Sequence, residues 1–427
     1  MQKTLKMSLQ ERDKKHIWHP LTQHKTSGDP IGIVKAKGVL LWDENGNEYI
    51  DGIASWYTAM YGHCNEKITS KVALQMLQLD QVVFTGFTHE PAVELSEKLM
   101  EILPTNQQKV FFNDNGSTAV EAGIKMALQY HFNTGNNRNT LIAFEDGFHG
   151  DTFGAMSVSG LSVYNGPFED FFLNVERIPI PTIENLSEVL FKLKALISNN
   201  EVAAFVYEPL VQGAAGMKFH EAKGLNEILK ICAENNIITV ADEVMTGFGK
   251  TGKYFASEYL ATKPDIMCLS KSLTAGIAAM SITSCTQEIF DAFLDDEISK
   301  GFFHAHTYSA NPLACAAAIA GIELLTSASI QRNIAVISSL HQAFVDKMIR
   351  HPKVASARTL GVILAFDLNI EMKRYGDLRN RLFVHFMKQG VFLRPLGNTI
   401  YVLPPFVITP EQLEKIYLSI EDVLVLV

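Results

Sequence analysis

Short apolar runs alternate with segments of helical length through the middle of this chain, and no other pattern in it narrows the range of folds as far. Runs of strand length occupy residues 109–112, 141–144, 202–207, 237–241 and 266–269. The segments between them carry apolar side chains three or four positions apart, as amphipathic helices do, at residues 117–132, 183–198 and 224–235. This alternation predicts βα units on a mainly parallel sheet between helices, which is an α/β fold.

The two ends of the chain follow a different pattern. Residues 36–50 predict an antiparallel hairpin that turns at Asn45-Gly46, a pair typical of type I′ turns. Beyond about residue 330, the expected order is a helix, a strand at 362–367, a helix at 376–389, a short hairpin around 396–398 and a last helix from Pro410. These elements predict a smaller α+β domain built from both chain ends.

A chain of 427 residues is long enough for two domains. We expect residues 57–330 to form the large domain. Residues 1–56 and 331–427 are expected to form the N-terminal and C-terminal parts of the small domain. Neither a low-complexity linker nor an internal repeat separates these segments.

The charge of the chain argues against nucleic acid as a partner. Its formal net charge is −9, and no basic run is longer than a few residues, so the electrostatic footprint of a DNA- or RNA-binding protein is missing. Five cysteines are scattered without CxxC spacing, which indicates reduced thiols rather than disulfides or a zinc site. We therefore expect a cytoplasmic protein that holds no metal.

The sequence does not have the pattern of a secreted or membrane protein. Residues Met1 to Arg12 are polar and of mixed charge, unlike the apolar core of a signal peptide. The most apolar stretch, residues 313–325, contains a glutamate and is shorter than the roughly 20 residues that cross a bilayer. We expect that stretch to be a buried helix.

A lysine and an acid stand at the ends of two successive predicted strands. Lys271 follows the apolar run at 266–269, and Asp242 follows the run at 237–241. An amine at the mouth of an apolar sheet is poorly hydrated, so its pKa should fall, and the neutral amine can attack an aldehyde to form a Schiff base. Pyridoxal phosphate is the aldehyde that fits, because a carboxylate such as Asp242 would keep its ring nitrogen protonated. The alternative for Lys271 alone is a solvated lysine in a loop.

The turn after the strand at 109–112 offers an anion site. Gly116, Ser117 and Thr118 lie where the next helix begins, so free backbone amides, the positive end of the helix dipole and two hydroxyls could receive a dianionic phosphate. The alternative is that Ser117 or Thr118 only caps the helix. The turn lacks the GKT or GKS of a Walker loop, and no GxGxxG follows a strand, so nucleotide hydrolysis and hydride transfer lack support.

Three further side chains have two interpretations each. Phe148 follows the strand at 141–144, where its ring could stack on a flat cofactor or pack in the core. Glu208 ends another strand and could orient a ring hydroxyl or cap a loop. Arg394 interrupts an apolar segment, and a lone guanidinium there would bind a substrate carboxylate or form an internal salt bridge.

In chain order, these residues belong to stretches that together resemble the class III, fold type I, pyridoxal phosphate-dependent aminotransferases over nearly the whole length. The stretches are Gly116-Ser-Thr-Ala-Val-Glu121, Phe148-His-Gly150, Glu208-Pro209, Ala241-Asp-Glu-Val-Met-Thr-Gly-Phe-Gly-Lys-Thr-Gly252, Leu269-Ser-Lys271 and His304-Ala-His-Thr-Tyr-Ser-Ala-Asn-Pro312. Each motif alone is weak, whereas their order and separation are specific. Within the family, the chain most resembles a branch that aminates 8-amino-7-oxononanoate in biotin synthesis. The stretches that carry this resemblance are His16-Ile-Trp18-His-Pro20, Asp51-Gly-Ile-Ala-Ser-Trp56-Tyr57, and Arg394 ahead of Tyr401.

The resemblance implies a role for each of these residues. Lys271 would carry the cofactor as a Schiff base and move the proton, and Asp242 would pair with the ring nitrogen. The other implied cofactor contacts are Gly116 and Ser117 to the phosphate, Phe148 and Val244 to the two faces of the ring, and His306 and Thr307 to the phosphate in the partner subunit. The implied substrate contacts are Trp56, Tyr57, Phe148, Lys271, Ala305 and Arg394. A homodimer with active sites at the subunit interface follows from this arrangement.

Five positions depart from the family pattern. Three of them, Leu21, Phe148 and Phe406, stand where tyrosine is common, so three hydroxyls are missing from the expected substrate site. Lys250 replaces an arginine and Ala305 a glycine. The resemblance favours S-adenosylmethionine as amino donor, with lysine as the alternative donor. The competing functions are another ω-amino acid, diamine or β-amino acid aminotransferase, an aminomutase, a dehydrogenase and a non-catalytic scaffold.

Overall fold

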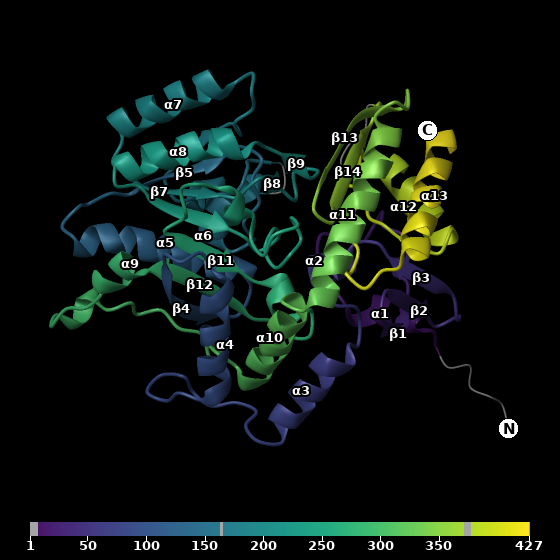
Figure 1. Cartoon of the computed structure of the whole chain (residues 1–427), viewed down its shortest axis with the longest axis horizontal. Coiled ribbons are helices and arrows are strands. Elements are labelled where there is room, and N and C mark those ends of the chain that lie inside the picture. Colours follow the sequence, from purple (N-terminus) through teal and green to yellow (C-terminus); the bar gives the residue numbers. More distant parts are fainter. Residues whose placement is uncertain (1–6, 163–164, 371–376, 427) are drawn as a thin grey trace.

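The computed structural model describes residues 7–162, 165–370 and 377–426, and a seven-stranded sheet forms the centre of the part that lies on the left in Figure 1. The order of strands across this sheet is β4-β12-β11-β10-β7-β5-β6. Their bounds are β4 Gln107–Asn113, β5 Thr140–Phe144, β6 Val175–Ile178, β7 Val202–Tyr207, β10 Ile238–Asp242, β11 Ile266–Leu269 and β12 Ser281–Thr286. The fold is α/β, as the sequence predicts.

The strands of the central sheet are mainly parallel. β10 pairs in parallel with β11 and with β7, and β5 pairs in parallel with β7 and with β6. β12 runs antiparallel to both of its neighbours, β11 and β4. All five strands predicted from the apolar runs are present in this sheet.

The other two strands, β6 and β12, are not apolar enough to be recognised in the sequence. β6 lies at the edge of the sheet and carries Glu176 and Arg177. β12 is rich in serine and threonine, yet it is buried. Its hydroxyls have partners inside the protein: Ser284 Oγ donates to Gln107 Oε1 at 2.7 Å, and Thr283 Oγ1 donates to a backbone carbonyl of the adjacent helix at 2.8 Å. Polar side chains can be buried where such bonds satisfy them.

Helices cover both faces of the central sheet. Alternate residues of β5 enter two different apolar clusters, because successive side chains of a strand point to opposite faces. One cluster contains side chains of α5 (Gly116–Asn133), and the other contains side chains of α7 (Leu186–Asn199) and α8 (Ala222–Glu234). These three helices match the predicted helical segments. Burial on both faces explains why the strands read as continuous apolar runs.

The most apolar stretch of the chain is a buried helix, as predicted. This helix, α10 (Pro312–Leu325), packs against α3 (Glu66–Met76) and α4 (Glu90–Ile102). Within the described residues, no single helix is long and apolar enough to cross a membrane, although α10 and α11 (Ala328–Met348) pass that test as a pair bent by 67°.

A four-stranded sheet joins the two ends of the chain. Its order is β1-β2-β3-β15, with bounds β1 Ile33–Lys37, β2 Leu40–Asp43, β3 Glu48–Asp51 and β15 Val391–Phe392. β15 pairs in parallel with β3, so that Ile50 lies opposite Val391 and Asp51 lies opposite Phe392. Segments from opposite ends of the sequence therefore lie side by side.

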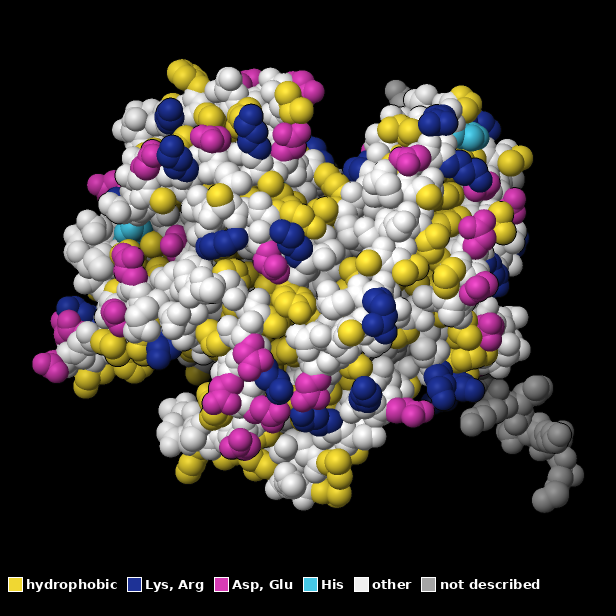
Figure 2. Space-filling model, in the orientation of Figure 1, with side chains coloured by type: hydrophobic (Ala, Val, Ile, Leu, Met, Phe, Trp, Pro, Cys, Tyr) yellow, Lys and Arg dark blue, Asp and Glu magenta, His cyan; other side chains and the backbone are white. Residues whose placement is uncertain are grey.

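A second group of elements completes the C-terminal part. It consists of a three-stranded sheet, β13 (Val354–Leu360), β14 (Ile363–Leu368) and β16 (Thr399–Val402), and the helices α11, α12 (Asp377–Lys388) and α13 (Pro410–Leu426). Figure 2 shows a notch between this part and the side of the molecule that carries α7 and α8. Residue 376, the predicted start of the helix at 376–389, lies outside the described residues. The domain bounds at residues 56 and 330 stay a prediction.

The predicted hairpin at 36–50 is present, but the type I′ prediction for its turn is wrong. That turn needs positive φ at both central residues, whereas Gly46 has a φ of +86° and Asn45 is not among the residues with positive φ. Gly46 N donates to Asp43 O at 3.1 Å, and Asp43 N donates to Asn47 O at 3.1 Å. The Asp43 carboxylate also accepts from the amides of Asn45 and Asn47, which stabilises a three-residue loop instead.

A left-handed turn follows β3. Ala54, Ser55, Trp56 and Tyr57, marked α2 in Figure 1, have φ values of +47°, +46°, +68° and +71°. This conformation costs about 1–2 kcal/mol for each residue with a side chain. A run of four therefore persists only because the surrounding structure holds it.

Candidate active site

Asp242 and Lys271 lie at the same edge of the central sheet. β10 ends at Asp242, which is opposite Cys268 of the parallel neighbour β11, and Lys271 follows just beyond the end of β11. Ligands of open parallel sheets bind at this edge, outside the carboxyl ends of the strands. The two strand ends bring an amine and a carboxylate to one region, as the sequence predicts.

Lys271 is partly buried and held against an aromatic ring. Its Nζ lies 5.6 Å from the centroid of the Tyr57 ring, and its φ of +49° is strained for a lysine. Burial lowers the pKa of Lys271, and the nearby carboxylates of Asp242 and Glu208 offset only part of that effect. A larger neutral fraction makes the amine a better nucleophile. The alternative of a solvated loop lysine is wrong.

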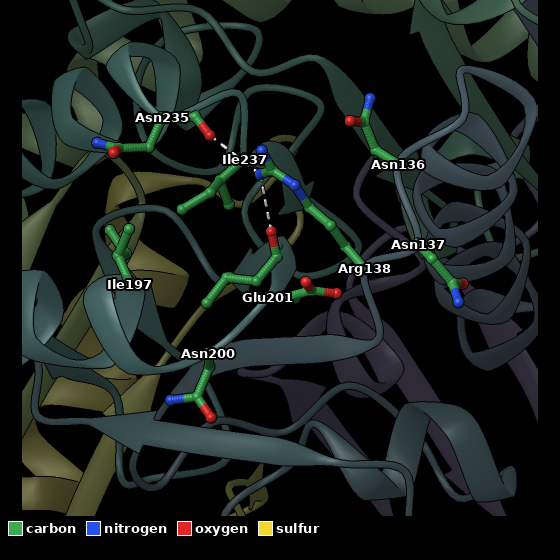
Figure 3. A pocket seen from close by; sticks show the side chains of 9 residues that line it. Asn136, Asn137, Arg138, Ile197, Asn200, Glu201, Asn235 and Ile237 are labelled. Atoms are coloured by element: carbon green, nitrogen blue, oxygen red, sulfur yellow. Dashed lines mark hydrogen bonds between the residues drawn. The ribbon is translucent and has the colours of Figure 1, made fainter.

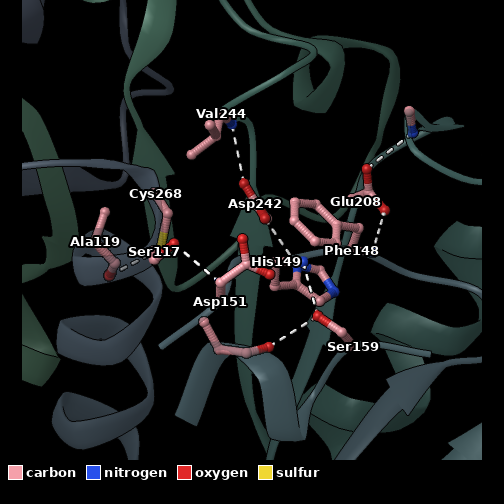
Figure 4. Close-up of polar contacts among 12 residues, drawn as sticks. Ser117, Ala119, Phe148, His149, Asp151, Ser159, Glu208, Asp242, Val244 and Cys268 are labelled. Atoms are coloured by element: carbon pink, nitrogen blue, oxygen red, sulfur yellow. Dashed lines mark hydrogen bonds and ion pairs between the residues drawn. The ribbon is translucent and has the colours of Figure 1, made fainter. Parts of the chain in front are cut away.

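Two hydrogen bonds fix the Asp242 carboxylate (Figure 4). The Val244 amide donates to Oδ1 at 3.0 Å, and His149 Nδ1 lies 2.7 Å from Oδ2. Both side chains of the His149–Asp242 pair are almost completely buried. Burial alone would lower the pKa of His149, but the ion pair with Asp242 outweighs burial and raises it. The imidazolium therefore persists to higher pH beside Asp242.

His149 is a candidate that the sequence patterns did not assign. It stands inside the Phe148-His-Gly150 stretch, but nothing in the sequence links it to Asp242, which lies 93 positions further along. The available signal was chemical: His149 is a titratable residue in a glycine-containing turn after a strand. Such turns at the carboxyl edge of a parallel sheet are where functional side chains gather.

The N-terminus of α5 is capped by residues other than Ser117. Asn115 caps the helix by accepting from the Thr118 amide at 3.1 Å, and Thr118 Oγ1 accepts from the Asn115 amide at 3.0 Å. Thr118 is thus the residue engaged in capping. Ser117 Oγ instead accepts a 3.3 Å bond from the Asp151 amide. The free amides and dipole of this 18-residue helix favour an anion beside Ser117.

Two glycines allow close packing around this helix end. A Cβ on Gly116 would lie 2.9 Å from Val244 Cγ1, and a Cβ on Gly150 would lie 2.1 Å from Ser117 Oγ. Gly150 also has a φ of +136°, which residues with a side chain rarely adopt. A larger residue at either position would displace Val244 or Ser117.

Replacing Gly150 with alanine is expected to weaken binding of the predicted cofactor, because the new methyl group must push Ser117 away from the helix end. Overpacking of this kind costs about 1–3 kcal/mol, and Kd should rise by about tenfold. An equilibrium titration with pyridoxal phosphate measures this change. Gly135→Ala is the control, since Gly135 has a φ of +79° but no atom within 4 Å of its added Cβ. Equal increases of Kd in both variants would contradict a role for Ser117.

Phe148 is exposed, so its ring is available for stacking and the core alternative is wrong. The residue is 44% exposed. Its backbone amide donates to Glu208 Oε2 at 3.1 Å, and the Gly213 amide donates to Glu208 Oε1 at 3.0 Å (Figure 4). Glu208, which is buried just beyond the end of β7, therefore joins the loops that carry Phe148 and Gly213.

Glu208 also gives the protein a pH-dependent stability. Burial raises its pKa to about 7, with His149 opposing the shift and Asp242 adding to it. Between its ordinary pKa of 4.5 and about 7, the folded protein keeps a proton that the unfolded chain has lost. This group's contribution to stability therefore falls as pH rises through that window.

Glu208→Gln removes this titration. We expect the free energy of unfolding of Glu208→Gln minus that of the parent to increase by about 2–3 kcal/mol from pH 5 to pH 8, because only the parent loses stability as Glu208 loses its proton. Urea unfolding of both cofactor-free proteins across this range measures the difference. A difference that does not change with pH would contradict the raised pKa.

Trp56 and Arg394 form a second cation–aromatic pair near the first. Arg394 Cζ lies 5.4 Å from the centroid of the Trp56 ring, while the adjacent Tyr57 faces Lys271. Within the described residues, Arg394 forms no ion pair with a carboxylate. The guanidinium is thus available for an acidic ligand, which favours the substrate-contact interpretation over an internal salt bridge.

Of the three predicted residues Ala305, His306 and Thr307, the last two contact parts of this chain other than Lys271. His306 Nδ1 lies 3.7 Å from Asp114 Oδ2, and Thr307 O accepts a 3.0 Å bond from Gln81 Nε2. Ala305 and Thr307 are exposed. Their predicted contacts with a partner's cofactor stay a prediction.

The departures from the family pattern lie in different environments. Phe148 and Leu21 are exposed, whereas Phe406 is fully buried, 5.8 Å from Tyr61 between ring centroids. Lys250 is also fully buried, and its Nζ donates to the Gly247 carbonyl at 2.6 Å. Burial lowers the pKa of Lys250 strongly, and the nearby Lys271 lowers it further. Because Phe406 is buried, a tyrosine hydroxyl at position 406 would lie in the core.

A separate hollow of about 390 Å³ lies at the amino ends of the parallel strands, on the side of the sheet opposite to Lys271 and Asp242 (Figure 3). Its lining comes from the segments that precede β5, β7 and β10, and consists of Asn136, Asn137, Arg138, Ile197, Asn200, Glu201, Val202, Asn235 and Ile237. The Arg138 guanidinium donates to the carbonyls of Val202, Asn235 and Asn236 at 2.9 to 3.0 Å. These three bonds join the segments that line the hollow.

Comparisons with known proteins agree with this geometry. A family model described as aminotransferase class-III matches residues 22–424. The chain belongs to the class III aminotransferases. A relative named adenosylmethionine-8-amino-7-oxononanoate aminotransferase, from Synechococcus elongatus, is 41% identical to this class III aminotransferase over 421 residues, which cover 96% of this chain and 98% of the relative.

Two solved structures share the fold of this class III aminotransferase. Adenosylmethionine-8-amino-7-oxononanoate aminotransferase from Methanocaldococcus jannaschii has a TM-score of 0.91 at 32% identity, covering 97% of this chain and 98% of that chain. An amine transaminase from an uncultivated Pseudomonas species, solved in its PLP-bound form, has a TM-score of 0.87 at 27% identity, covering 95% and 97%. The fold is therefore PLP fold type I, and pyridoxal phosphate is the cofactor.

Proposed function

We propose that this class III aminotransferase transfers an amino group to 8-amino-7-oxononanoate, giving 7,8-diaminononanoate in biotin biosynthesis, with S-adenosylmethionine as the amino donor. The observation that carries the proposal is the nearly full-length similarity to proteins named for this reaction in Synechococcus elongatus and Methanocaldococcus jannaschii. The lowered pKa of Lys271 and the guanidinium of Arg394 beside Trp56 support a transamination of a carboxylate-bearing substrate.

The residues around Lys271 fit pyridoxal phosphate. Gly116 and Ser117 would hold the phosphate at the N-terminus of α5, where the backbone amides are free. Phe148 and Val244 would contact the two faces of the ring. Asp242 would pair with the pyridine nitrogen, since its carboxylate is fixed by two hydrogen bonds and buried at the edge of the sheet.

Lys271 and Asp242 would divide the chemistry between them. Pyridoxal phosphate, when bound, supplies an aldehyde for amines and a ring that withdraws electrons. Lys271 would attach the cofactor and, once the donor has displaced it, take the proton from the donor's α-carbon with its neutral Nζ. In the second half-reaction Lys271 would return a proton to the former ketone carbon of the acceptor. Asp242, held by His149, would pair with the ring nitrogen and stabilise its protonated form.

Arg394 would bind the carboxylate of 8-amino-7-oxononanoate. A guanidinium recognises a carboxylate through two parallel hydrogen bonds, so the plane of the group matters. The Trp56 ring, whose centroid lies 5.4 Å from Arg394 Cζ, would help to hold the guanidinium in place. Trp56 and Tyr57 would contact the aliphatic chain of the substrate, between its carboxylate and the reacting carbon near Lys271.

The site would be completed by a second copy of the chain in a cytoplasmic homodimer. His306 and Thr307 would reach the phosphate of the partner's cofactor. The residues around them expose apolar area, with Phe303 at 75% and Tyr308 at 61%, and exposed apolar patches mark interaction surfaces. All five cysteines are free, which suits a reducing compartment. Light scattering of the purified protein tests the dimer.

One observation favours a second function, the transamination of other amines. The solved amine transaminase from Pseudomonas has nearly the same fold. The two functions are distinguished by incubating the holoenzyme and 8-amino-7-oxononanoate with either S-adenosylmethionine or lysine, and assaying 7,8-diaminononanoate by mass spectrometry. Product with S-adenosylmethionine supports the proposal, and product with lysine alone corrects the donor. Absence of product with both, together with turnover of simple amines, would favour the second function.

A further inference from the structure

Three polar side chains, those of Asp51, Ser55 and His63, form a cluster that includes a member of the left-handed turn Ala54–Tyr57. The Asp51 carboxylate oxygen Oδ2 accepts from Ser55 Oγ at 2.9 Å and lies 2.9 Å from His63 Nε2. Its other oxygen accepts from the Ile53 amide at 3.2 Å. The Asp51 side chain is fully buried. A buried carboxylate with three donors holds those donors in fixed positions.

The backbone of His63 is bonded to the loop between β1 and β2. Its backbone amide donates to Gly38 O at 2.7 Å, and Gly38 N donates to His63 O at 3.0 Å. Gly38 lies in the loop between β1 and β2. The imidazole that contacts Asp51 is therefore anchored to a second, separate loop.

The turn itself connects the two halves of the candidate active site. Ser272, the neighbour of Lys271, donates from Oγ to Tyr57 O at 2.8 Å. On the other side, Gly52 N donates to Phe392 O at 3.0 Å, two positions before Arg394. A shift of the turn would therefore change the spacing between the amine and the guanidinium.

We propose that Asp51, Ser55 and His63 are positioning residues for substrate binding, because they hold the left-handed turn and with it the side chains of Trp56 and Tyr57. This inference rests on the proposed function, in which Trp56 and Tyr57 contact the substrate. The three residues act through the turn and do not touch the reacting atoms.

The expected effect follows from the strain of the turn. Four left-handed residues are unfavourable on their own, so loss of the polar cluster lets the turn adopt other conformations. Apparent substrate affinity falls by the fraction of molecules that keep the competent turn. Molecules that do bind substrate have the turn in place, so their turnover changes little.

Asp51→Ala tests the proposal in the holoenzyme with two measurements. KM for 8-amino-7-oxononanoate should rise by about tenfold or more, while kcat stays within about twofold of the parent. Amide hydrogen exchange at Tyr57, Thr58 and Ala59, whose N–H groups bond within the turn, should become faster. A fall in kcat with unchanged KM, or unchanged exchange at these amides, would overturn the proposal.

Asp43→Ala is the matched control. Asp43 is also buried in the four-stranded sheet, where its carboxylate accepts from the amides of Asn45 and Asn47 and from Tyr49 Oη. Asp43→Ala should lower Tm without changing KM or the exchange of the turn. An increase of KM equal to that of Asp51→Ala would show that general loosening of the sheet is responsible, and would overturn the proposal.

A second pair of variants covers the case in which Asp51→Ala fails to fold. His63→Leu removes the donor to Asp51 and should raise KM, whereas His63→Gln keeps a donor and should restore KM toward the parent value. Equal KM values for the two variants would contradict the proposal. If the parent does not aminate 8-amino-7-oxononanoate, the proposed function fails, and the exchange measurement still decides whether the cluster holds the turn.

Discussion

Lys271→Ala should reduce transamination by about 10⁴-fold, because the variant would lose both the amine proposed to attach the cofactor and the base proposed to move the proton. Steady-state assays of product measure the loss. A second measurement is independent of activity: borohydride reduction followed by peptide mass spectrometry should find the cofactor bound to Lys271 in the parent and find no labelled peptide in the variant.

Lys253→Ala is the control for this prediction. Lys253 is exposed, and its Nζ lies 4.2 Å from the centroid of the Tyr259 ring. This variant should keep the parent's rate and its borohydride labelling. Turnover of Lys271→Ala at the parent's rate would show that another amine carries the reaction.

The second large effect is expected from Asp242→Asn, which should lower kcat by about 10²–10³-fold. The amide has nearly the shape of the carboxylate but no charge, so it cannot stabilise a protonated ring nitrogen, and the ion pair with His149 is lost. Rapid-mixing measurement of the half-reaction with the amino donor separates this chemical effect from substrate binding.

Asp265→Asn is the matched control for the charge. Asp265 precedes β11 at the opposite edge of the sheet, and its carboxylate accepts from the Thr239 amide at 2.8 Å and from the Thr239 hydroxyl at 2.7 Å. This variant should lose stability and keep the half-reaction rate. Equal losses of rate in the two variants would show that Asp242 acts only on the fold.

Most of the central sheet could be predicted from the sequence because its buried strands consist mainly of apolar residues. β5, β7, β10 and β11 are covered on both faces, so they are continuous apolar runs. β12 could not be predicted in this way. Its hydroxyls find partners on β4 and α5, which are distant in the sequence, and only the fold brings those partners together.

The candidate site could likewise be predicted only where local sequence patterns determine it. Lys271 and Asp242 could be placed together because neighbouring parallel strands end at one edge of a sheet. The His149–Asp242 ion pair depends on how a loop folds back, which no local pattern encodes. The left-handed turn was also not predicted, because positive φ is usually signalled by glycine or asparagine, and residues 54–57 contain neither.

Because β3 pairs with β15, one edge of β3 can be completed only after most of the chain has been synthesised. Asp51 and Phe392 are opposite each other in the finished sheet, but a ribosome adding about 5–20 residues per second needs roughly 20–70 s to proceed from the first to the second. During that interval one edge of β3 has no strand beside it, and an uncovered edge invites pairing with other nascent chains. Arg394 is made just after β15, so the part of the proposed substrate site that Arg394 would supply forms among the last parts of the molecule, when translation is nearly complete.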